Sequence, residues 1–423
     1  MQAGAQHVAV IGAGIVGVAV AIELLRDGRR VTLIDPGRPG GEQAASYGNG
    51  GWISPSSIVP PSMPGLWRRV PGFLADPLGP LAIRWQHLPR LLPWLARYVR
   101  AGSTVARVEA TARALRPLLA DAPDRHRRLA DEAGVGELIE RHGLLYIFPD
   151  RAAFAAEALA WRLRRDNGVQ WLELDADELR QQEPELDRRY TFGVLVQAGA
   201  HCADPGAYVA ALAAHAVAQG AVLNQARATG LRIESGRLRA VATDAGEIAC
   251  DAAVICAGAR SRDLACAAGD RVLLETERGY HAVITDPGTG PRHPVMPSDG
   301  KMAVTMTRGG LRIAGQVELA GLDAAPDWRR ATILRDYALR TFPNLPRDLA
   351  ADRVRLWMGH RPATPDALPV IGRASGCAEV VHAFGHGHIG LAAGPITGRL
   401  VADLLAGHPP VIDPAPYSPA RFH

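Results

Sequence analysis

The chain has 423 residues, of which 48% are hydrophobic and 21% charged, a composition typical of a globular protein long enough for two domains of ordinary size. The formal net charge is only +4, and the 47 basic residues, all arginine except Lys301, form no long basic run, so nucleic acid is not an implied partner. The 5 cysteines form no C-x-x-C pair, which argues against a disulfide framework and favours a reducing cytoplasm.

The first predicted strand ends at Ile11 and leads directly into a G-x-G-x-x-G pattern formed by Gly12, Gly14 and Gly17. In this pattern Gly12 permits the tight turn, Gly14 the close approach of a pyrophosphate, and Gly17 the close packing of a helix on the strand. A second apolar strand ends in Asp35, where an acid accepts hydrogen bonds from an unphosphorylated adenosine ribose. These residues predict a site for FAD or NAD rather than NADP.

The segment Pro36–Pro55 is rich in glycine and polar residues and is too long for a simple turn. It begins at the carboxyl end of the second predicted strand, where open α/β sheets bind ligands. Ser46, Asn49, Gly50 and Gly51 are suited to wrap a flat or phosphorylated ligand with backbone and amide groups. The alternative interpretation is an ordinary surface loop.

The region 81–134 has a helical pattern, with an apolar stripe from Trp85 to Val99 that is flanked by arginines. Such a helix either lies on a membrane surface or packs on its own domain, and we favour the second interpretation. A strand at Leu144–Phe148 and a helix at 152–167 follow. This α+β pattern predicts a substrate-binding domain without a nucleotide fingerprint.

The nucleotide-domain pattern returns in mid-chain. Asp204 is a predicted N-cap, Pro205 occupies the first helical position, and the helix ends at Gly220. The apolar strand at 252–256 then leads into the small-residue turn Ala257–Ser261. This turn again allows a ligand to approach the backbone closely.

The last third of the chain contains the candidate substrate residues. Tyr280 and His281 are adjacent, so in a strand they face opposite sides of the sheet. Arg361 lies in the proline-rich segment Leu356–Ile371, where a stiff backbone presents the guanidinium as a fork for a carboxylate. Glycines within 385–390 lead into a terminal helix whose N-terminus points toward the ligand.

Together these motifs resemble those of FAD-dependent oxidoreductases of the D-amino acid oxidase superfamily, especially the bacterial D-amino acid and D-hydroxyproline dehydrogenases. The motifs that carry the likeness are Gly12–Gly17 with Asp35, Ala45–Gly51, Asp204–Tyr208, Ala257–Ser261, Glu277–His281, Gly359–Gly372 and Phe384–Leu391. The resemblance implies an α/β plus α+β fold, in which a Rossmann-type FAD-binding domain carries an inserted mixed-sheet substrate domain. The expected FAD-binding domain comprises 1–80, 190–270 and 350–423, and the expected substrate domain comprises 81–189 and 271–349.

The resemblance also assigns the site residues. The implied FAD contacts are Gly12, Gly14, Ile15, Val16, Gly17, Asp35, Ser46, Asn49, Gly50, Gly51, Ala228, Ala257, Gly258, Gly385, Gly387, His388, Ile389, Gly390 and Leu391. Arg361 matches the family's carboxylate-binding arginine, and Tyr280 or His388 is expected to orient or deprotonate the amine. Sarcosine-oxidase relatives attach flavin through a cysteine shortly before T-P-D, but Trp357–Arg361 contains none, so we expect non-covalent FAD. No metal is expected.

The implied reaction is oxidative deamination of a D-amino acid, or of a D-proline-type imino acid, by hydride transfer to flavin. We expect the electrons to pass to a quinone or another acceptor, in the cytoplasm or at the inner face of the plasma membrane. One alternative is a glycine, sarcosine or opine oxidase of the same superfamily that uses oxygen or a partner subunit. Two others are an NAD-dependent dehydrogenase that shares only the first fingerprint, and a flavoprotein without enzymatic activity.

Overall fold

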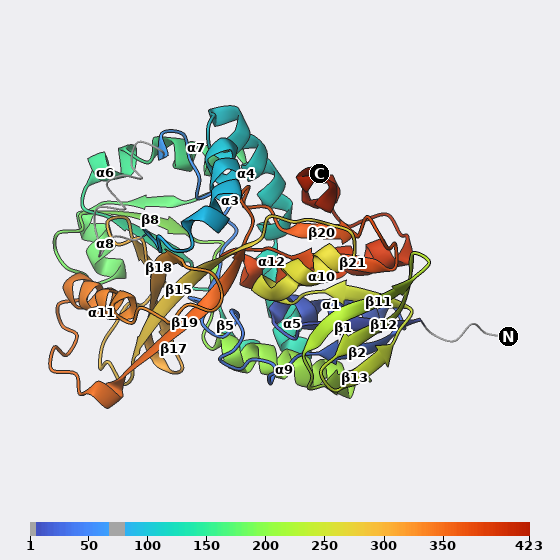
Figure 1. Cartoon of the computed structure of the whole chain (residues 1–423). Coiled ribbons are helices and arrows are strands. Elements are labelled where there is room, and N and C mark those ends of the chain that lie inside the picture. Colours follow the sequence, from blue (N-terminus) through green and yellow to red (C-terminus); the bar gives the residue numbers. More distant parts are fainter. Residues whose placement is uncertain (1–5, 67–80) are drawn as a thin grey trace.

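The structure is a computed structural model that describes residues 6–66 and 81–423. It has two halves, each built on one large sheet (Figure 1). In Figure 1 the half that contains β1, β2 and α1 lies on the right, and the half that contains β17, α8 and α11 lies on the left. The helix α12 lies between them and is packed on the first half.

The first half is built on a six-stranded sheet of order β10-β2-β1-β14-β21-β20. Its strands are β1 (His7–Ile11), β2 (Arg30–Ile34), β10 (Val222–Asn224), β14 (Ala252–Ile255), β20 (Val370–Arg373) and β21 (Val380–Phe384). All neighbours are parallel except β20 and β21. The central strands are continuous apolar runs because parallel sheets are covered on both faces.

Two helices of this half start at the same edge of the sheet. The helix α1 (Ile15–Arg26) follows β1, and α12 (Gly390–Ala406) follows β21. They pack closely, since a Cβ added at Gly398 would lie 2.6 Å from the carbonyl oxygen of Ala19. Because β1 and β21 run in the same direction, the N-termini of both helices face one region. The remaining helices of this half are α5 (Ala122–Glu132), α9 (Pro205–Ala218) and α10 (Ser261–Ala267).

The second half is built on a nine-stranded mixed sheet of order β19-β15-β18-β17-β16-β6-β8-β7, with β4 paired to β18. Its strands are β4 (Leu81–Ile83), β6 (Leu144–Phe148), β7 (Leu172–Leu174), β8 (Phe192–Val196), β15 (Glu275–Ile284), β16 (Val295–Pro297), β17 (Ala303–Thr307), β18 (Gly310–Leu319) and β19 (Val354–Ala363). Its helices include α3 (Leu88–Ala101), α8 (Ala176–Gln182) and α11 (Arg329–Thr341). The helix α4 (Val105–Leu119) packs against α12 of the first half.

Two three-stranded sheets complete the fold. One, of order β3-β9-β5, contains β3 (Trp52–Ile53), β9 (Ala200–Cys202) and β5 (Ile139–Glu140). The other is a meander of β11 (Ala228–Glu234), β12 (Arg237–Thr243) and β13 (Gly246–Ala249). The first of these sheets fixes the end of the glycine-rich loop that follows β2.

Several local predictions are confirmed. The strand and helix around the glycine fingerprint form as expected, as does the strand Leu144–Phe148. The carboxylate of Asp204 caps α9 by accepting a hydrogen bond from the backbone N–H of Ala207 at 3.0 Å.

Two other local predictions are wrong. Residues 81–83 form a strand rather than the start of a helix, because they pair in parallel with Val317–Leu319. The predicted helix 152–167 is divided into α6 (Arg151–Ala155) and α7 (Ala158–Asp166), which are separated by a turn.

The sheets also differ from the predicted domain boundaries. Both β8 and β19 belong to the nine-stranded sheet, although 190–270 and 350–423 were expected in the FAD-binding domain. Long-range pairing explains why β19 lies in the nine-stranded sheet. It pairs with β15 along its whole length, from Val354 opposite Ile284 to Ala363 opposite Glu275. The end of the first expected segment, residues 67–80, lies outside the described residues.

The predicted apolar stripe from Trp85 to Val99 is partly buried and partly exposed to solvent. Leu91 and Trp94 are buried, and the indole N–H of Trp94 donates to the carbonyl oxygen of Ala363 at 3.1 Å. Trp85, which precedes the helix, is 71% exposed, and Leu92 is 56% exposed. Within residues 6–66 and 81–423, no helix combines the length and the apolar character needed to cross a membrane.

Candidate active site

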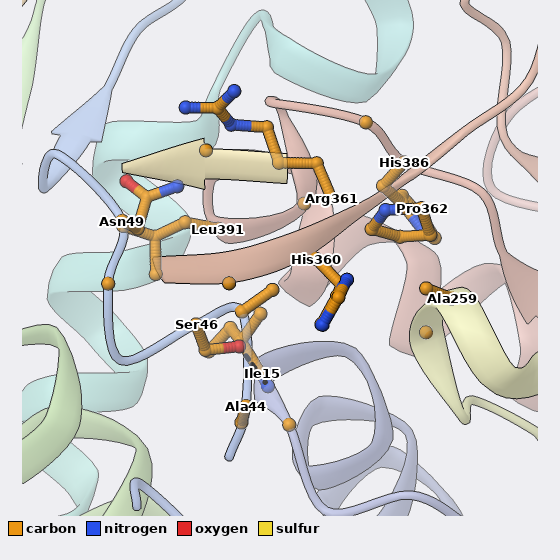
Figure 2. A pocket seen from close by; sticks show the side chains of 18 of the residues that line it. Ile15, Ala44, Ser46, Asn49, Ala259, His360, Arg361, Pro362, His386 and Leu391 are labelled. Carbon is orange, nitrogen blue, oxygen red and sulfur yellow. Dashed lines mark hydrogen bonds between the residues drawn. The ribbon is translucent and has the colours of Figure 1, made fainter. Parts of the chain in front are cut away.

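A cavity of about 730 Å³ lies between the two halves and is lined by residues of both. Figure 2 shows Ile15, Ala44 and Ser46 on one side of it and Arg361 on the opposite side. The first side is formed by the starts of α1 and α12 and by the loop after β2. The second is formed by strands of the nine-stranded sheet.

The three fingerprint glycines have different environments. Gly12 has a φ of +107°, and a Cβ on it would lie 2.4 Å from the carbonyl oxygen of Cys256. A Cβ on Gly17 would lie 1.8 Å from the carbonyl oxygen of Gly12. Gly14 lines the cavity, and the closest atom to a Cβ added there, apart from its chain neighbours and its own helix backbone, is the hydroxyl oxygen of Ser46 at 3.3 Å within the described residues. Gly12 and Gly17 therefore hold the helix against the sheet, while Gly14 leaves open backbone for a ligand.

Both helix N-termini at the cavity lack a side-chain cap from their N-cap residue. The N-cap of α1 is Gly14, and that of α12 is Ile389. The first amides of a helix have no partner within the helix and carry the positive end of its dipole, so they suit an anion. The hydroxyl oxygen of Ser46 accepts from the amide of Ile15 at 3.1 Å, which leaves its proton free to donate toward a phosphate.

Asp35 is held at the edge of the cavity by backbone bonds. Its two carboxylate oxygens accept from the amides of Ala13 and Gly37, at 2.8 and 2.9 Å. Each oxygen retains acceptor capacity, and a ribose hydroxyl is a fitting donor. The open backbone at Gly14, the two helix starts and this carboxylate together fit a dinucleotide such as FAD.

The cavity brings together most of the predicted site residues. Those that line it are Gly12, Gly14, Ile15, Val16, Asp35, Ser46, Asn49, Gly50, Ala228, Ala257, Gly258, Arg361, Gly387, His388, Ile389, Gly390 and Leu391. Gly17, Gly51, Gly385 and Tyr280 are not among the lining residues. Gly51 and Gly385 instead shape the backbone, because both have positive φ and an added Cβ would lie 2.6 Å from the Cys202 carbonyl oxygen and 2.9 Å from Thr364 Cγ2, respectively.

Tyr280 faces away from the cavity, which differs from its expected role at the amine. Its buried hydroxyl donates to Glu318 Oε2 at 2.6 Å and accepts from the amide of Asp327 at 3.0 Å. Burial and the bond to Glu318 raise the pKa of Tyr280 to about 12. His281 points to the opposite face, as alternation requires, where it stacks on Trp357 beneath the loop after β2.

Arg361 lies on the cavity face of β19 and is held by the neighbouring strands. Its Nη1 donates to the carbonyl oxygen of Gln316 at 2.9 Å, and its Nη2 to that of Gly315 at 3.4 Å. The β18 strand has a bulge here, with Gln316 at a φ of +60°. A Cβ on Gly279 of β15 would lie 2.3 Å from Arg361 Cζ, so the guanidinium rests directly on the backbone of that strand. We call Gly279, Gly315 and Gln316 the guanidinium cradle.

The charge of Arg361 is partly balanced by a carboxylate on the neighbouring strand. Glu277 pairs with Arg361 in the strand register. Burial lowers the pKa of Arg361, while the carboxylate of Glu277 acts in the opposite direction. Burial raises the pKa of Glu277, and the charge of Arg361 counteracts this. An anchored guanidinium that faces a cavity is a complement for a carboxylate.

His388 provides a neutral imidazole at the same cavity. The residue is exposed within the cavity, and the protein that surrounds the cavity desolvates the imidazole, which together with the charge of Arg361 lowers its pKa to about 4. His388 is therefore uncharged at neutral pH and can accept or hold a proton. The positive charge of Arg361 is one cause of this lowered pKa, because both predicted substrate residues line the same cavity.

Sequence reasoning missed several lining residues on the sheet side. Trp357 was detectable, because it lies four residues before Arg361 on the same strand and alternation places both on one face. His360 also lines the cavity, with its Nδ1 2.8 Å from Thr276 Oγ1. Met296, Ala303 and Ala314 come from three separate strands and have no local motif that marks them.

The chain matches the DAO family model, described as FAD dependent oxidoreductase, over residues 7–404. It is 61% identical to a D-amino-acid oxidase of Bradyrhizobium diazoefficiens, with 99% of each chain covered. It is 32% identical to D-amino acid dehydrogenase 2 of Ralstonia nicotianae, over 98% of this chain and 100% of the relative.

Solved structures show the same fold at low sequence identity. An L-proline dehydrogenase from P. horikoshii has a TM-score of 0.74 at 22% identity and covers 99% of this chain and 98% of its own. A glycine oxidase from Bacillus cereus has a TM-score of 0.69 at 19% identity, with 95% of each chain covered. The glycine-lined cavity, the family match along nearly the whole chain and these relatives lead to one conclusion: the chain belongs to the DAO family of FAD-dependent oxidoreductases.

Proposed function

We propose that this protein oxidises the Cα–N bond of a D-amino acid, including D-proline-type imino acids. The α-hydrogen leaves with its electron pair, and the resulting iminium ion loses a proton from nitrogen to become an imine. Water hydrolyses the imine of a primary amino acid to a 2-oxo acid and ammonia, whereas a proline-type substrate gives a cyclic imine. Bound FAD supplies the hydride-accepting chemistry. The names of the 61% and 32% identical relatives, a D-amino-acid oxidase and a D-amino acid dehydrogenase, support this substrate class.

The observation that carries the proposal is the anchored guanidinium of Arg361. It binds the substrate carboxylate, while the guanidinium cradle and Glu277 fix its position and charge. Holding the carboxylate fixes the α-carbon with respect to the cofactor, and such positioning supplies several kcal/mol of a reaction barrier. The neutral imidazole of His388 orients the substrate amine or holds its proton.

The side of the cavity with the helix N-termini holds the cofactor in this proposal. The starts of α1 and α12, with Gly14 and Ser46, bind the diphosphate and the flavin edge, and Asp35 binds the adenosine ribose. Positive helix ends stabilise the negative charge that develops during the reaction. Because the residues Trp357–Arg361 contain no cysteine, we propose that FAD is bound non-covalently.

The test is anaerobic flavin reduction by the purified holoenzyme. We expect D-amino acids to bleach the flavin absorbance, and we expect their L-enantiomers and the corresponding amines without a carboxylate to react at least about 10²-fold more slowly. Denaturation by acid should release all of the flavin into the supernatant. Reduction by glycine or sarcosine alone would support the alternative amine-oxidase function.

For the electron acceptor we propose dioxygen, because the 61% identical relative is named an oxidase. A quinone at a membrane surface is the second candidate. It is supported by the exposed Leu92, which lies among the arginines of α3, by the exposed Trp85 just before that helix, and by the relatives named dehydrogenases. Stopped-flow mixing of the reduced enzyme with air-saturated buffer distinguishes them, because an oxidase is reoxidised at least as fast as it turns over.

A further inference from the structure

The helix α12 contains a proline close to the end that faces the cavity. Pro395 is the sixth residue of this helix, which begins at Gly390. A proline has no N–H, so it cannot donate the helical hydrogen bond to the carbonyl oxygen four residues earlier, which belongs to Leu391. Because Leu391 is buried, its carbonyl oxygen needs a donor from another part of the protein.

His126 of α5 provides that donor. Its Nε2 lies 2.8 Å from the carbonyl oxygen of Leu391 and 3.3 Å from that of Ala392. A carbonyl oxygen only accepts, so Nε2 carries the proton and donates it to this pair. His126 is fully buried, and its helix packs against α12 (Figure 1). The imidazole therefore replaces the hydrogen bond that Pro395 cannot make.

Tyr208 of α9 completes this arrangement. Its hydroxyl oxygen lies 2.9 Å from Nδ1 of His126, and the centroids of the two rings are 5.6 Å apart. Burial lowers the pKa of His126 to about 4, so the imidazole is neutral at pH 7. A neutral imidazole with its proton on Nε2 accepts at Nδ1, so the Tyr208 hydroxyl donates there. Two directed hydrogen bonds thus connect α9, α5 and the first turn of α12.

The carbonyls that His126 holds belong to residues at the cavity. Leu391, which is labelled in Figure 2, and Ala392 both line it, as does Gly390 before them. Within residues 6–66 and 81–423, neither His126 nor Tyr208 is among the lining residues. A change at His126 is therefore expected to reach the cavity through the first turn of α12.

We propose that His126 is a positioning residue for the cofactor, because it holds the first turn of α12 in the conformation that presents its amides to the flavin. The inference rests on the proposed function, which places the flavin edge at this helix start. Without the imidazole, the Leu391 carbonyl has no donor unless the turn loosens and lets water in. The apoprotein tolerates a loosened turn, whereas bound flavin requires an ordered one, so the loss falls on flavin binding.

The test is a double-mutant cycle between His126 and Pro395. His126→Leu removes the donor to Leu391, and Pro395→Ala restores a backbone N–H that can bond to Leu391 within the helix. His126→Leu alone should weaken FAD binding to the apoprotein by about 10- to 100-fold, the effect of one buried carbonyl without a donor. In the Pro395→Ala background the same change should weaken it by less than about 3-fold. Quenching of flavin fluorescence during titration gives each Kd.

Two further variants make the cycle specific. The matched control is Pro93→Ala, the same substitution at an exposed position inside α3, which should not restore FAD binding to His126→Leu. His126→Gln keeps an amide N–H near the position of Nε2, so it should bind FAD less than about 10-fold more weakly than the wild type. If His126→Leu does not fold, His126→Asn takes its place, because its shorter amide does not reach Leu391.

The midpoint potential of the bound flavin is a readout that a role in folding alone would not change. Reduced flavin gains negative charge, which the positive end of α12 stabilises. We expect His126→Leu to weaken the binding of reduced flavin about 10-fold more than that of oxidised flavin, which lowers the two-electron potential by about 30 mV. The double variant with Pro395→Ala should return to the wild-type potential.

The contrary outcomes are distinct from one another. A lower unfolding temperature of the His126→Leu apoprotein, with unchanged Kd and potential, would show that His126 acts on folding alone. Equal losses with and without Pro395 would overturn the inference, since His126 would then not act through the Leu391 carbonyl. Both results leave the proposed function standing if D-amino acids reduce the wild-type flavin. A wild-type protein that binds no FAD would remove the proposed function and the inference together.

Discussion

The two sides of the cavity are built by different means. The side we assign to the cofactor is made largely of backbone, because glycines bring the starts of α1 and α12 to the cavity and neither N-cap residue caps its helix with a side chain. The side we assign to the substrate presents the side chain of Arg361 on β19, which the backbone of Gly279 on β15 and of Gln316 on β18 holds in place. A change on the first side is therefore expected to affect folding and cofactor content, whereas a change on the second should affect catalysis in a folded holoenzyme.

The largest expected effect separates two glycines on the cofactor side. Gly17→Ala places a Cβ 1.8 Å from the carbonyl oxygen of Gly12, where backbone must move, so we expect a loss of about 3 kcal/mol or more of stability and little soluble protein. At Gly14 an added Cβ lies 3.3 Å from the movable hydroxyl of Ser46, and the γ-carbons of Gly14→Val would occupy open space at the cavity. We expect this variant to fold without flavin.

Thermal unfolding of the apoproteins and flavin absorbance per chain check this pair. The apo form of Gly14→Val should unfold within a few degrees of the wild-type apoprotein. Wild-type flavin content in Gly14→Val would contradict the assignment of the phosphate site. A stable, soluble Gly17→Ala protein would show that the helix can shift away from the sheet.

The second prediction moves to the substrate side. Truncating one partner of a buried charge pair typically costs about 2–5 kcal/mol, so Arg361→Ala should lower kcat/KM by on the order of 10² to 10³, with Arg361→Lys intermediate because it keeps charge but lacks the planar fork. Flavin content should remain near wild type. Rapid-reaction reduction normalised to bound flavin, repeated with an amine that lacks the carboxylate, provides the measurement. Equal losses of kcat/KM for the amino acid and for the amine without a carboxylate would show that Arg361 does not bind the substrate carboxylate.

The contrast between the two sides also explains what the sequence could predict. The turn before α1 and the acid at the end of β2 are close together in the chain, so Gly12, Gly14 and Asp35 were predicted at the cavity from spacing alone, and all three line it. The guanidinium cradle depends on the pairing of strands far apart in sequence and on a bulge at Gln316, and nothing in local propensity indicates either.

The orientation of Tyr280 is a second feature that the sequence alone could not predict. Alternation along the strand required Tyr280 and His281 to face opposite sides, but it did not determine which side faces the cavity. Burial of Tyr280 against Glu318 and Asp327 decided this. The boundaries at β8 and β19 were missed for a related reason, because membership of a sheet depends on partners far away in the chain.

The third prediction tests the cradle with a smaller change. Gly279→Ala places a Cβ 2.3 Å from Arg361 Cζ, which is the far end of a flexible side chain, so the guanidinium moves and the strand remains. We expect KM for a D-amino acid to rise about 10-fold, with flavin content and unfolding temperature nearly unchanged. The matched control is Gly230→Ala on β11, where an added Cβ meets no atom within 4 Å. A loss that is as large for a carboxylate-free amine would show that Gly279 acts on something other than Arg361.

The smallest expected effect concerns His388, whose pKa is lowered to about 4 by burial and by the charge of Arg361. A lowered pKa means that the imidazole loses its proton already in acid, so about nine tenths of it is neutral at pH 5 and nearly all at pH 7. We therefore expect kcat/KM measured between pH 5 and 8 to show no ionisation that belongs to His388. His388→Asn keeps a neutral polar group there and should lower kcat/KM by less than about 10-fold without changing the shape of the profile.

The lowered pKa of His388 also makes the stability of the folded protein depend on pH, because the unfolded chain binds a proton at His388 more readily than the folded protein does. In the unfolded chain His388 takes up a proton below pH 6.5, but in the folded protein it does so only near pH 4, so its contribution to stability is complete above pH 6.5 and decreases as the pH falls toward 4. His388→Asn removes this term and should make unfolding less dependent on pH in that window. An ionisation between pH 6 and 7 in the wild-type profile that disappears in His388→Asn would contradict the neutral imidazole. It would also make His388 a group that exchanges a proton with the substrate during turnover, and the substrate side would then contain an acid–base group as well as a carboxylate anchor.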